Sequence, residues 1–294
     1  SDRRWFFNDE STALALVWRG KIAAMGIPLN EKEKAVWQKG LNWLQSHNDN
    51  GYYVTPSGTE RSWMDTYHFK QDTITYNQGI FVTALIAMEK LGLNIEKDQI
   101  EKGMQAYRSL KYSSGRLQLS SKRPYHDISG LFGNFIAARL FGVDILDPQT
   151  VISTVQSQPK YDEQHMHVVA NEQGKAIPAL EFNQFYEQGD YQRGADWPLF
   201  TAIAQEEAER CGATHNPFFW QEKLTSMAHY KNAEYMRINA SGISINPKRI
   251  NHAWNAAVYT IAREILGADH YYSITAPRQT DLLSEASQIQ SSTL

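Results

Sequence analysis

The chain has little cysteine, no long apolar run and almost no excess charge of either sign. Among its 294 residues there is one cysteine, Cys211, so an internal disulfide framework and a multi-cysteine zinc site are excluded. No apolar run approaches the roughly 18 residues that a membrane-spanning helix needs, and the first residues lack the apolar core of a signal peptide. A formal net charge of −3 gives no electrostatic reason to expect a nucleic acid as a partner.

Apolar and aromatic residues, by contrast, are abundant. Hydrophobic residues make up 42% of the chain, and its 8 Trp and 15 Tyr exceed what a core alone usually requires. This composition is typical of a globular protein with a substantial core. We expect one domain over residues 1–276, followed by a tail or weak last helix over 277–294. The single cysteine and the missing leader favour the cytoplasm, and a secreted or periplasmic location stays open if the chain begins inside a longer protein.

Apolar residues recur at intervals of three and four along the whole chain, which predicts an all-α protein. Capping residues, N1 prolines and C-terminal glycines divide this pattern into separate helices. The nine expected helices run from about Leu14 to Met25, from Asn30 through Leu44, from Ile74 to Leu91, from Lys97 to Leu110, from Ile128 to Phe141, from Asp147-Pro148 onward, from Asp196 to Gly212, from Asn216-Pro217 onward and from His252 to Leu266.

The helices differ in character and the loops differ in length. The third, fifth and ninth helices are apolar around most of their circumference, whereas the second, fourth and eighth carry dense charge. The first kind belongs inside a fold and the second outside. The loops before odd-numbered helices are long and cover residues 48–73, 111–127, 158–195 and 236–251. We therefore expect helical hairpins in an inner and an outer ring, with the long loops on one functional face and short strands in some of them, such as Ile243–Ile245.

These long loops combine carboxylates with aromatic and amide side chains. Aromatic rings stack on the apolar faces of sugars, amides and carboxylates bind sugar hydroxyls, and cleavage of a glycoside uses two carboxyl groups. The candidate site residues on this face are Asp9, Glu60, Trp63, Asp65, Tyr76, Gln78, Asp127, Gln192, Trp197, Glu234, His252 and Trp254. The pattern favours an oligosaccharide or polysaccharide as the substrate.

Several of these residues also have simpler explanations. Asp127 and Asp196 stand where helix N-caps stand, the tryptophans could anchor the core, and Glu234 could be an ordinary charged residue. His165-x-His167 could belong to a metal site, but it has no helper carboxylates at a familiar spacing. The sequence contains neither a Gly-x-Ser-x-Gly elbow nor a glycine-rich phosphate loop. We predict a site without a metal or a cofactor.

Short segments that follow one another in order across most of the chain give a more specific indication. They are Phe7–Glu10, Ser62–Asp65 followed by Tyr76–Gly79, Gly189–Pro198, and Ala233–Tyr235 followed by His252–Asn255. Together they resemble the six-hairpin (α/α)6-barrel glycosidases, in particular the amylo-α-1,6-glucosidase and glucoamylase-like families. The matching parts of those families are an early Arg-Asp, a Trp-Met-Asp with the inner helix after it, a Gly-x-x-Trp-Pro, and a Glu followed by Ala-Trp-Ser.

The resemblance implies an inverting glycoside hydrolase with Asp65 as general acid and Glu234 as general base, roughly 6.5–9.5 Å apart. It implies that the aromatic, amide and histidine candidates line the sugar subsite, with Asp9 and Asp127 as ligands of sugar hydroxyls. Glu60 is the alternative acid. These families commonly carry an N-terminal β-sandwich, which we expect to be a domain absent from this chain.

The chain also departs from the family pattern. Asn8-Asp9 replaces Arg-Asp, and Ala-Trp-Asn replaces Ala-Trp-Ser. Nine or ten helices are legible where six hairpins need twelve, so we expect a toroid with one hairpin incomplete. The alternatives are a phosphorylase, a polysaccharide lyase that uses Tyr125-His126 with Arg123, and a non-catalytic toroid that binds carbohydrate or protein.

Overall fold

The computed structural model describes residues 9–55, 63, 71–96, 98–162, 164–171, 173, 194–239, 241–245, 247 and 254–267. Within these residues nine α-helices confirm the all-α expectation. They are α1 (Asp9–Ala24), α2 (Glu31–Gln45), α3 (Thr75–Lys90), α4 (Gln99–Ser109), α5 (Phe132–Phe141), α6 (Pro148–Ser157), α7 (Pro198–Arg210), α8 (Pro217–His229) and α9 (Asn255–Leu266). The expected tail over 277–294 lies outside the described residues.

Short antiparallel strands occupy the long loops, as the sequence predicts. They are β1 (Asn48–Asp49) with β2 (Tyr52–Tyr53), β3 (Gln118–Ser120) with β4 (Arg123–Asp127) and β5 (Val169–Ala170), and β6 (Met236–Asn239) with β7 (Gly242–Ile245). The expected strand at Ile243–Ile245 is therefore part of β7.

The helix ends follow local chemistry, with two corrections to the sequence-based boundaries. Asn30 and Glu33 form a reciprocal capping box at the start of α2, and Asp147 caps α6 ahead of its N1 proline. However, α1 starts at Asp9 instead of near Leu14. The start of α9 is at Asn255, three residues later than expected, and Trp254 precedes it as the N-cap residue without a side-chain capping bond. Helix boundaries are the least certain part of a pattern-based prediction, because terminal turns depend on tertiary contacts.

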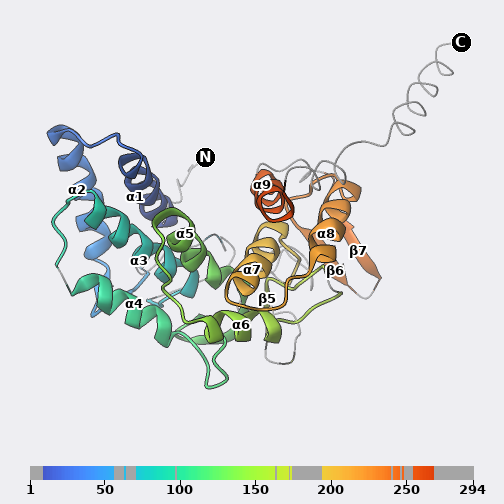
Figure 1. Ribbon diagram of the computed structural model, residues 1–294. Coiled ribbons are helices and arrows are strands. Elements are labelled where there is room, and N and C mark those ends of the chain that lie inside the picture. Colours follow the sequence, from blue (N-terminus) through green and yellow to red (C-terminus); the bar gives the residue numbers. More distant parts are fainter. Residues whose placement is uncertain are drawn as a thin grey trace, which may run out of the picture.

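The odd-numbered helices form the interior of the molecule. Every residue of α3 from Thr75 to Met88 is buried. Along the chain, α1 packs on α3, α3 on α5, α5 on α7, and α7 on α9. Figure 1 shows these helices as an arc, with α2, α4, α6 and α8 along its outside. The inner and outer arrangement is therefore confirmed for the part of the chain that the structure describes, and in that part no helix closes the ring between α9 and α1.

Glycine lets the inner helices approach one another closely. A Cβ atom placed on Gly133 of α5 would lie 2.3 Å from the Cα and the carbonyl carbon of Gly79 on α3. On the other side of α3, a Cβ on Gly20 of α1 would lie 2.6 Å from the Cβ of Ala87. Contacts this short are impossible for real side chains, so hydrogen is the only side chain that permits these two helix crossings.

Hydrogen bonds join each long loop to the next across one face of the arc. Ile74 forms an antiparallel bridge with Ser120, which links the first long loop to the second. Pairing of β4 with β5 links the second to the third, and a bridge between Asp196 and Met236 links the third to the loop before α9. The long loops therefore meet on one face, as the hairpin arrangement predicts. In the described part of the chain, no helix is both long and apolar enough to span a bilayer.

Candidate functional site

A cluster of aromatic rings forms the centre of this loop face. The ring of Trp63 lies 4.9 Å, centroid to centroid, from that of Trp197 in an edge-on arrangement and 6.3 Å from that of Tyr76. Trp197 also stacks on Tyr235 at 5.6 Å and lies 5.8 Å from Trp254. The cluster brings together a loop, the start of α3, the start of α7, the strand entry at β6 and the start of α9. The segments that carry the family resemblance around these rings therefore converge in space.

Asp127 is linked to the aromatic cluster indirectly, through Ser129. Trp63 donates its indole N–H to the Ser129 hydroxyl at 2.9 Å. Ser129 in turn donates its hydroxyl and its backbone N–H to Oδ1 of Asp127, at 2.6 and 2.8 Å. Asp127 is fully buried and caps the short 3-10 helix η1 (Ile128–Leu131), so the capping explanation is correct. The expected role as a direct ligand of sugar hydroxyls is not supported, because both carboxylate oxygens are removed from the surface.

Burial also changes the acid–base properties of this region. Desolvation raises the pKa of Asp127 to about 7, although the hydrogen bonds from Ser129 act in the opposite direction. Within the described residues, Oδ2 of Asp127 has no hydrogen-bond partner. Burial likewise raises the pKa of the Tyr76 hydroxyl well above its usual value, and the negative charges of Glu10 and Asp127 add to this. A carboxyl group that titrates near pH 7 and a neutral phenol therefore lie together at the base of the cluster.

Glu234 lies in a short segment that is fixed on both sides. The Asn255 side chain donates to the carbonyl oxygen of Ala233 at 2.8 Å. Met236 exchanges two backbone hydrogen bonds with Asp196, at 2.8 and 2.9 Å. Glu234 itself is 8% exposed and does not belong to a helix. Asn255 of the Ala-Trp-Asn segment thus holds the residue that precedes Glu234.

A cavity of about 590 Å³ opens beside the cluster between the inner helices. Trp254 and Tyr76 line it, together with Glu10 at the start of α1. Trp254 is 39% exposed, whereas Trp63 and Trp197 are buried. Trp18 of α1, which is 60% exposed, also lines the cavity, so Trp254 and Trp18 both present accessible rings to it.

Under the loop face, Lys223 and Asp196 form a fully buried ion pair that the sequence did not indicate. The Lys223 ammonium donates to Oδ2 of Asp196 at 2.6 Å and to the Gln164 carbonyl at 2.8 Å. The Thr201 hydroxyl donates to the other carboxylate oxygen. The expectation of Asp196 as an N-cap is wrong, because Trp197 is the cap residue of α7 and the Asp196 carboxylate binds side chains. Buried lysines are rare. The residues before Lys223 in the sequence, Gln221 and Glu222, are polar, so the sequence does not distinguish Lys223 from a surface lysine.

Gln78 has a structural role and lies away from the cavity. Its amide donates to the carbonyl oxygens of Gly51 and Gly103, at 2.9 and 3.0 Å. Its Oε1 accepts the backbone N–H of Tyr53 at 2.7 Å. Because Gln78 is fully buried and bonded to three backbone groups, it cannot serve as a sugar ligand as expected.

Several predicted site residues lie outside the described part of the chain. They are Glu60, Asp65, Gln192 and His252, together with the side chain of Asp9, whose backbone begins α1. Trp63 and Trp254 are the described neighbours of Asp65 and His252 along the chain.

The residues considered for a metal site and for a lyase have other partners in the structure. His165 contacts Asp162 and Ser226, whereas Nδ1 of His167 faces the Gly194 carbonyl, so the two histidines do not share a partner. No group of three or more metal-ligating side chains occurs among the described residues. Arg123, which a lyase would use to neutralise charge, forms an ion pair of 2.8 Å with the buried carboxylate of Asp72.

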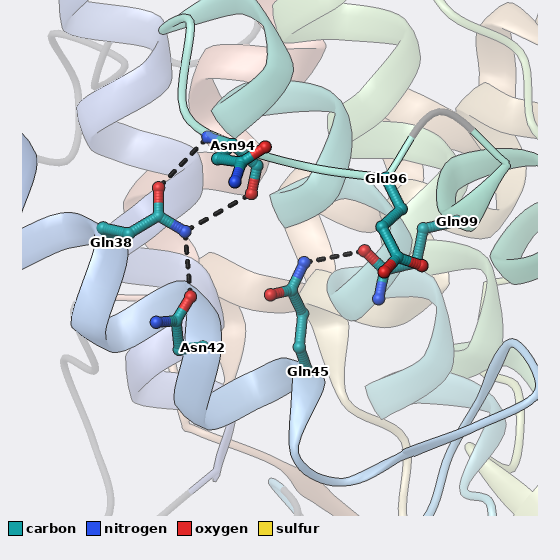
Figure 2. Close-up of a pocket in the computed structure, with 6 residues that line it drawn as sticks. All are labelled: Gln38, Asn42, Gln45, Asn94, Glu96 and Gln99. Carbon is teal, nitrogen blue, oxygen red and sulfur yellow. Dashed lines mark hydrogen bonds between the residues drawn. The ribbon is translucent and has the colours of Figure 1, made fainter.

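Another hollow, of about 310 Å³, lies between α2 and the start of α4 and is lined by amides and one carboxylate (Figure 2). Gln38 bonds the backbone N–H and carbonyl of Asn94, at 3.1 and 3.3 Å, and Gln45 donates to Gln99 at 2.7 Å. These amides bind the protein itself, so they fasten α2 to the α3–α4 connection.

No protein-family model matches the chain, and none of the curated proteins matches it. Its fold is similar to that of a solved structure described as "Glycosidase Wild Type", with a TM-score of 0.54 and 17% sequence identity. The similarity covers 91% of this chain and 69% of the other. At this identity the comparison establishes a mostly helical, glycosidase-like fold, and the activity has to be argued from the site.

Proposed function

We propose that this protein is a carbohydrate-active hydrolase, an inverting glycosidase in which Asp65 protonates the leaving oxygen and Glu234 activates water. The observation that carries the proposal is the packing of Trp63 on Trp197 and of Trp197 on Tyr235. Trp63 precedes Asp65 by two residues, and Tyr235 follows Glu234 directly. Each proposed catalytic residue is therefore within two positions of a ring that contacts Trp197, which supports a shared site.

The surrounding residues suit this role. The anchors at Ala233 and Met236 hold Glu234 in place, which a general base needs in order to orient water. Trp254, accessible at the cavity, is the proposed stacking surface for a sugar ring. Tyr76, whose hydroxyl is hydrogen-bonded to Glu10, is proposed to line the subsite, and Asp127 acts through Ser129 to position Trp63. Asp9, Gln192 and His252 complete the proposed subsite, and the buried Trp197 supports it from within the aromatic cluster. Glu60 remains the alternative acid.

The direct test is hydrolysis of a panel of oligosaccharides and aryl glycosides by the wild-type chain and by Asp65→Asn and Glu234→Gln. General acid–base catalysis contributes about 10²–10⁴-fold, so each variant should lose that much turnover. Proton NMR of the first product should show inversion at the anomeric carbon. Asp49→Asn and Glu96→Gln, on other parts of the surface, should keep full activity.

Each outcome has a clear meaning. Full activity in both Asp65→Asn and Glu234→Gln would refute the assignment of the pair. Loss in Glu60→Gln with full activity in Asp65→Asn would transfer the acid role to Glu60. Sugar binding by calorimetry without turnover of any substrate would favour the non-catalytic toroid. Release of an unsaturated product or a sugar phosphate would instead indicate a lyase or a phosphorylase.

A further inference from the structure

A serine, a histidine and an aspartate lie in hydrogen-bonding contact at a second hollow, beside α8. Oγ of Ser226 lies 2.8 Å from Nε2 of His165. Nδ1 of the same ring lies 2.7 and 2.9 Å from the two carboxylate oxygens of Asp162. This is the order nucleophile, base and orienting carboxylate that serine hydrolases of unrelated folds share, and it is recognised by geometry and not by sequence position.

The local structure defines which nitrogen of His165 carries the proton. Asp162 accepts the backbone N–H groups of Gln164 and His165, both at 2.9 Å, and this turn holds its carboxylate against the ring. An ionised carboxylate only accepts hydrogen bonds, so Nδ1 is the donor in that contact. Nε2 then presents its lone pair to the Ser226 hydroxyl. The same hydroxyl also lies 3.9 Å from Sδ of Met236.

The hollow is accessible and offers the other groups that acyl transfer needs. It has a volume of about 640 Å³ and is lined by the three residues and by Gln221, Thr225 and Tyr230. His165 is 4% exposed and Ser226 is partly exposed, so the base is shielded while the hydroxyl can be reached. Helical hydrogen bonds occupy the backbone N–H groups around Ser226. The Thr225 hydroxyl donates to the Gln221 carbonyl at 2.9 Å, so the donors for a developing oxyanion are the Gln221 side-chain amide and the Tyr230 hydroxyl.

We propose that Ser226 is the nucleophile of a second site, which hydrolyses short-chain carboxylic esters. Oγ bonds to the carbonyl carbon while Nε2 of His165 takes the hydroxyl proton. The C–O bond to the alcohol breaks as His165 returns that proton to the departing oxygen, which leaves an acylated Ser226. Water then attacks the acyl carbon, gives one proton to His165, and the proton passes to Oγ as the acid leaves. One ester and one water become one acid and one alcohol.

The test uses the full chain with a fluorophosphonate probe and with p-nitrophenyl acetate. The probe should form an adduct on Ser226, located by peptide mass spectrometry, because Oγ displaces fluoride from phosphorus while His165 accepts the proton. Ser226→Ala should abolish labelling and ester hydrolysis. His165→Gln and Asp162→Asn should slow both by about 10²-fold or more. Ser157→Ala, at an exposed serine of α6 outside this hollow, is the matched control and should still be labelled.

An adduct elsewhere, or equal labelling of wild type and Ser226→Ala, would overturn the proposal. So would a His165→Gln variant that melts at a lower temperature but reacts at the wild-type rate, because the three residues would then only fasten the loop to α8. Asp65→Asn and Glu234→Gln should label normally. Failure of the ester site is therefore separable from failure of the glycosidase proposal.

Discussion

The Lys223 ammonium lies 2.6 Å from the Asp196 carboxylate, and both side chains are completely buried. Desolvation lowers the pKa of Lys223, whereas the charge of Asp196 and the hydrogen bond to it act to raise it. Through the backbone bridge between Asp196 and Met236, this pair supports the strand entry next to Glu234. Asp196 also directly precedes Trp197 in the sequence. The ion pair thus connects α8 to both sides of the candidate site.

Replacing Lys223 with Met should destabilise the protein strongly. The variant leaves a buried carboxylate without its counter-charge, which typically costs about 3–5 kcal/mol. Lys223→Met combined with Asp196→Asn should recover part of this loss, because the uncompensated charge is gone. Urea unfolding gives the free energies, with the exposed Lys39→Met as the control. A change below about 1 kcal/mol in Lys223→Met would contradict the buried pair.

Asp127→Asn should change how stability depends on pH. The pKa of Asp127 is about 7 in the folded protein and close to 3.9 in an unfolded chain. Because the folded pKa is higher, the folded state binds the proton more tightly. This stabilising contribution is complete below about pH 4 and is lost as the pH rises to about 7. Relative to Asp127→Asn, the wild type should lose about 1.4 kcal/mol per pH unit in that window.

Unfolding titrations at half-unit steps from pH 4 to 8 measure this difference. Asn at position 127 can still accept the hydrogen bonds of Ser129, so the cap is kept. Parallel stability curves for the two proteins would show that Asp127 titrates normally.

Gly133→Ala should disrupt the crossing of α3 and α5. The new methyl group would lie 2.3 Å from the Gly79 backbone, so the helices must separate. We expect a loss of about 3 kcal/mol or more. At Gly40 on α2 the nearest atom to a new Cβ lies at 3.8 Å, so Gly40→Ala should instead stabilise by up to about 1 kcal/mol. Thermal melts of the two variants should shift in opposite directions, and a shift in the same direction would contradict this crossing.

Trp254→Ala should weaken sugar binding more than it weakens folding, if Trp254 is the stacking surface. Loss of one aromatic contact of about 1 kcal/mol corresponds to a roughly fivefold higher Kd. Trp254→Ala is introduced into the inactive Glu234→Gln protein, and calorimetric titration with the best substrate measures the Kd. Tyr161→Ala, another partly exposed aromatic residue, is the control. Equal affinities in the Trp254→Ala and control proteins would exclude the stacking role.

Local sequence signals located the helices and some of the residues that converge at the site. Asn30, Asp147 and Pro148 start helices through contacts within a few residues, so their effect can be read from the chain. The order of the Trp-Met-Asp, Trp-Pro and Glu-Tyr segments can be read directly along the chain. The sequence misassigned Gln78, because its partners at Gly51 and Gly103 lie more than twenty residues away.

By itself, then, the sequence determined an all-α chain with charged outer helices, apolar inner helices and long loops carrying carboxylates and tryptophans. These properties depend on side-chain periodicity and on capping within one or two turns. Only the tertiary structure decided that Lys223 is buried against Asp196, that Asn255 holds Ala233, and that Ser226 meets His165. Each of these contacts joins residues 22 to 61 positions apart, and their pairing depends on how the helices pack.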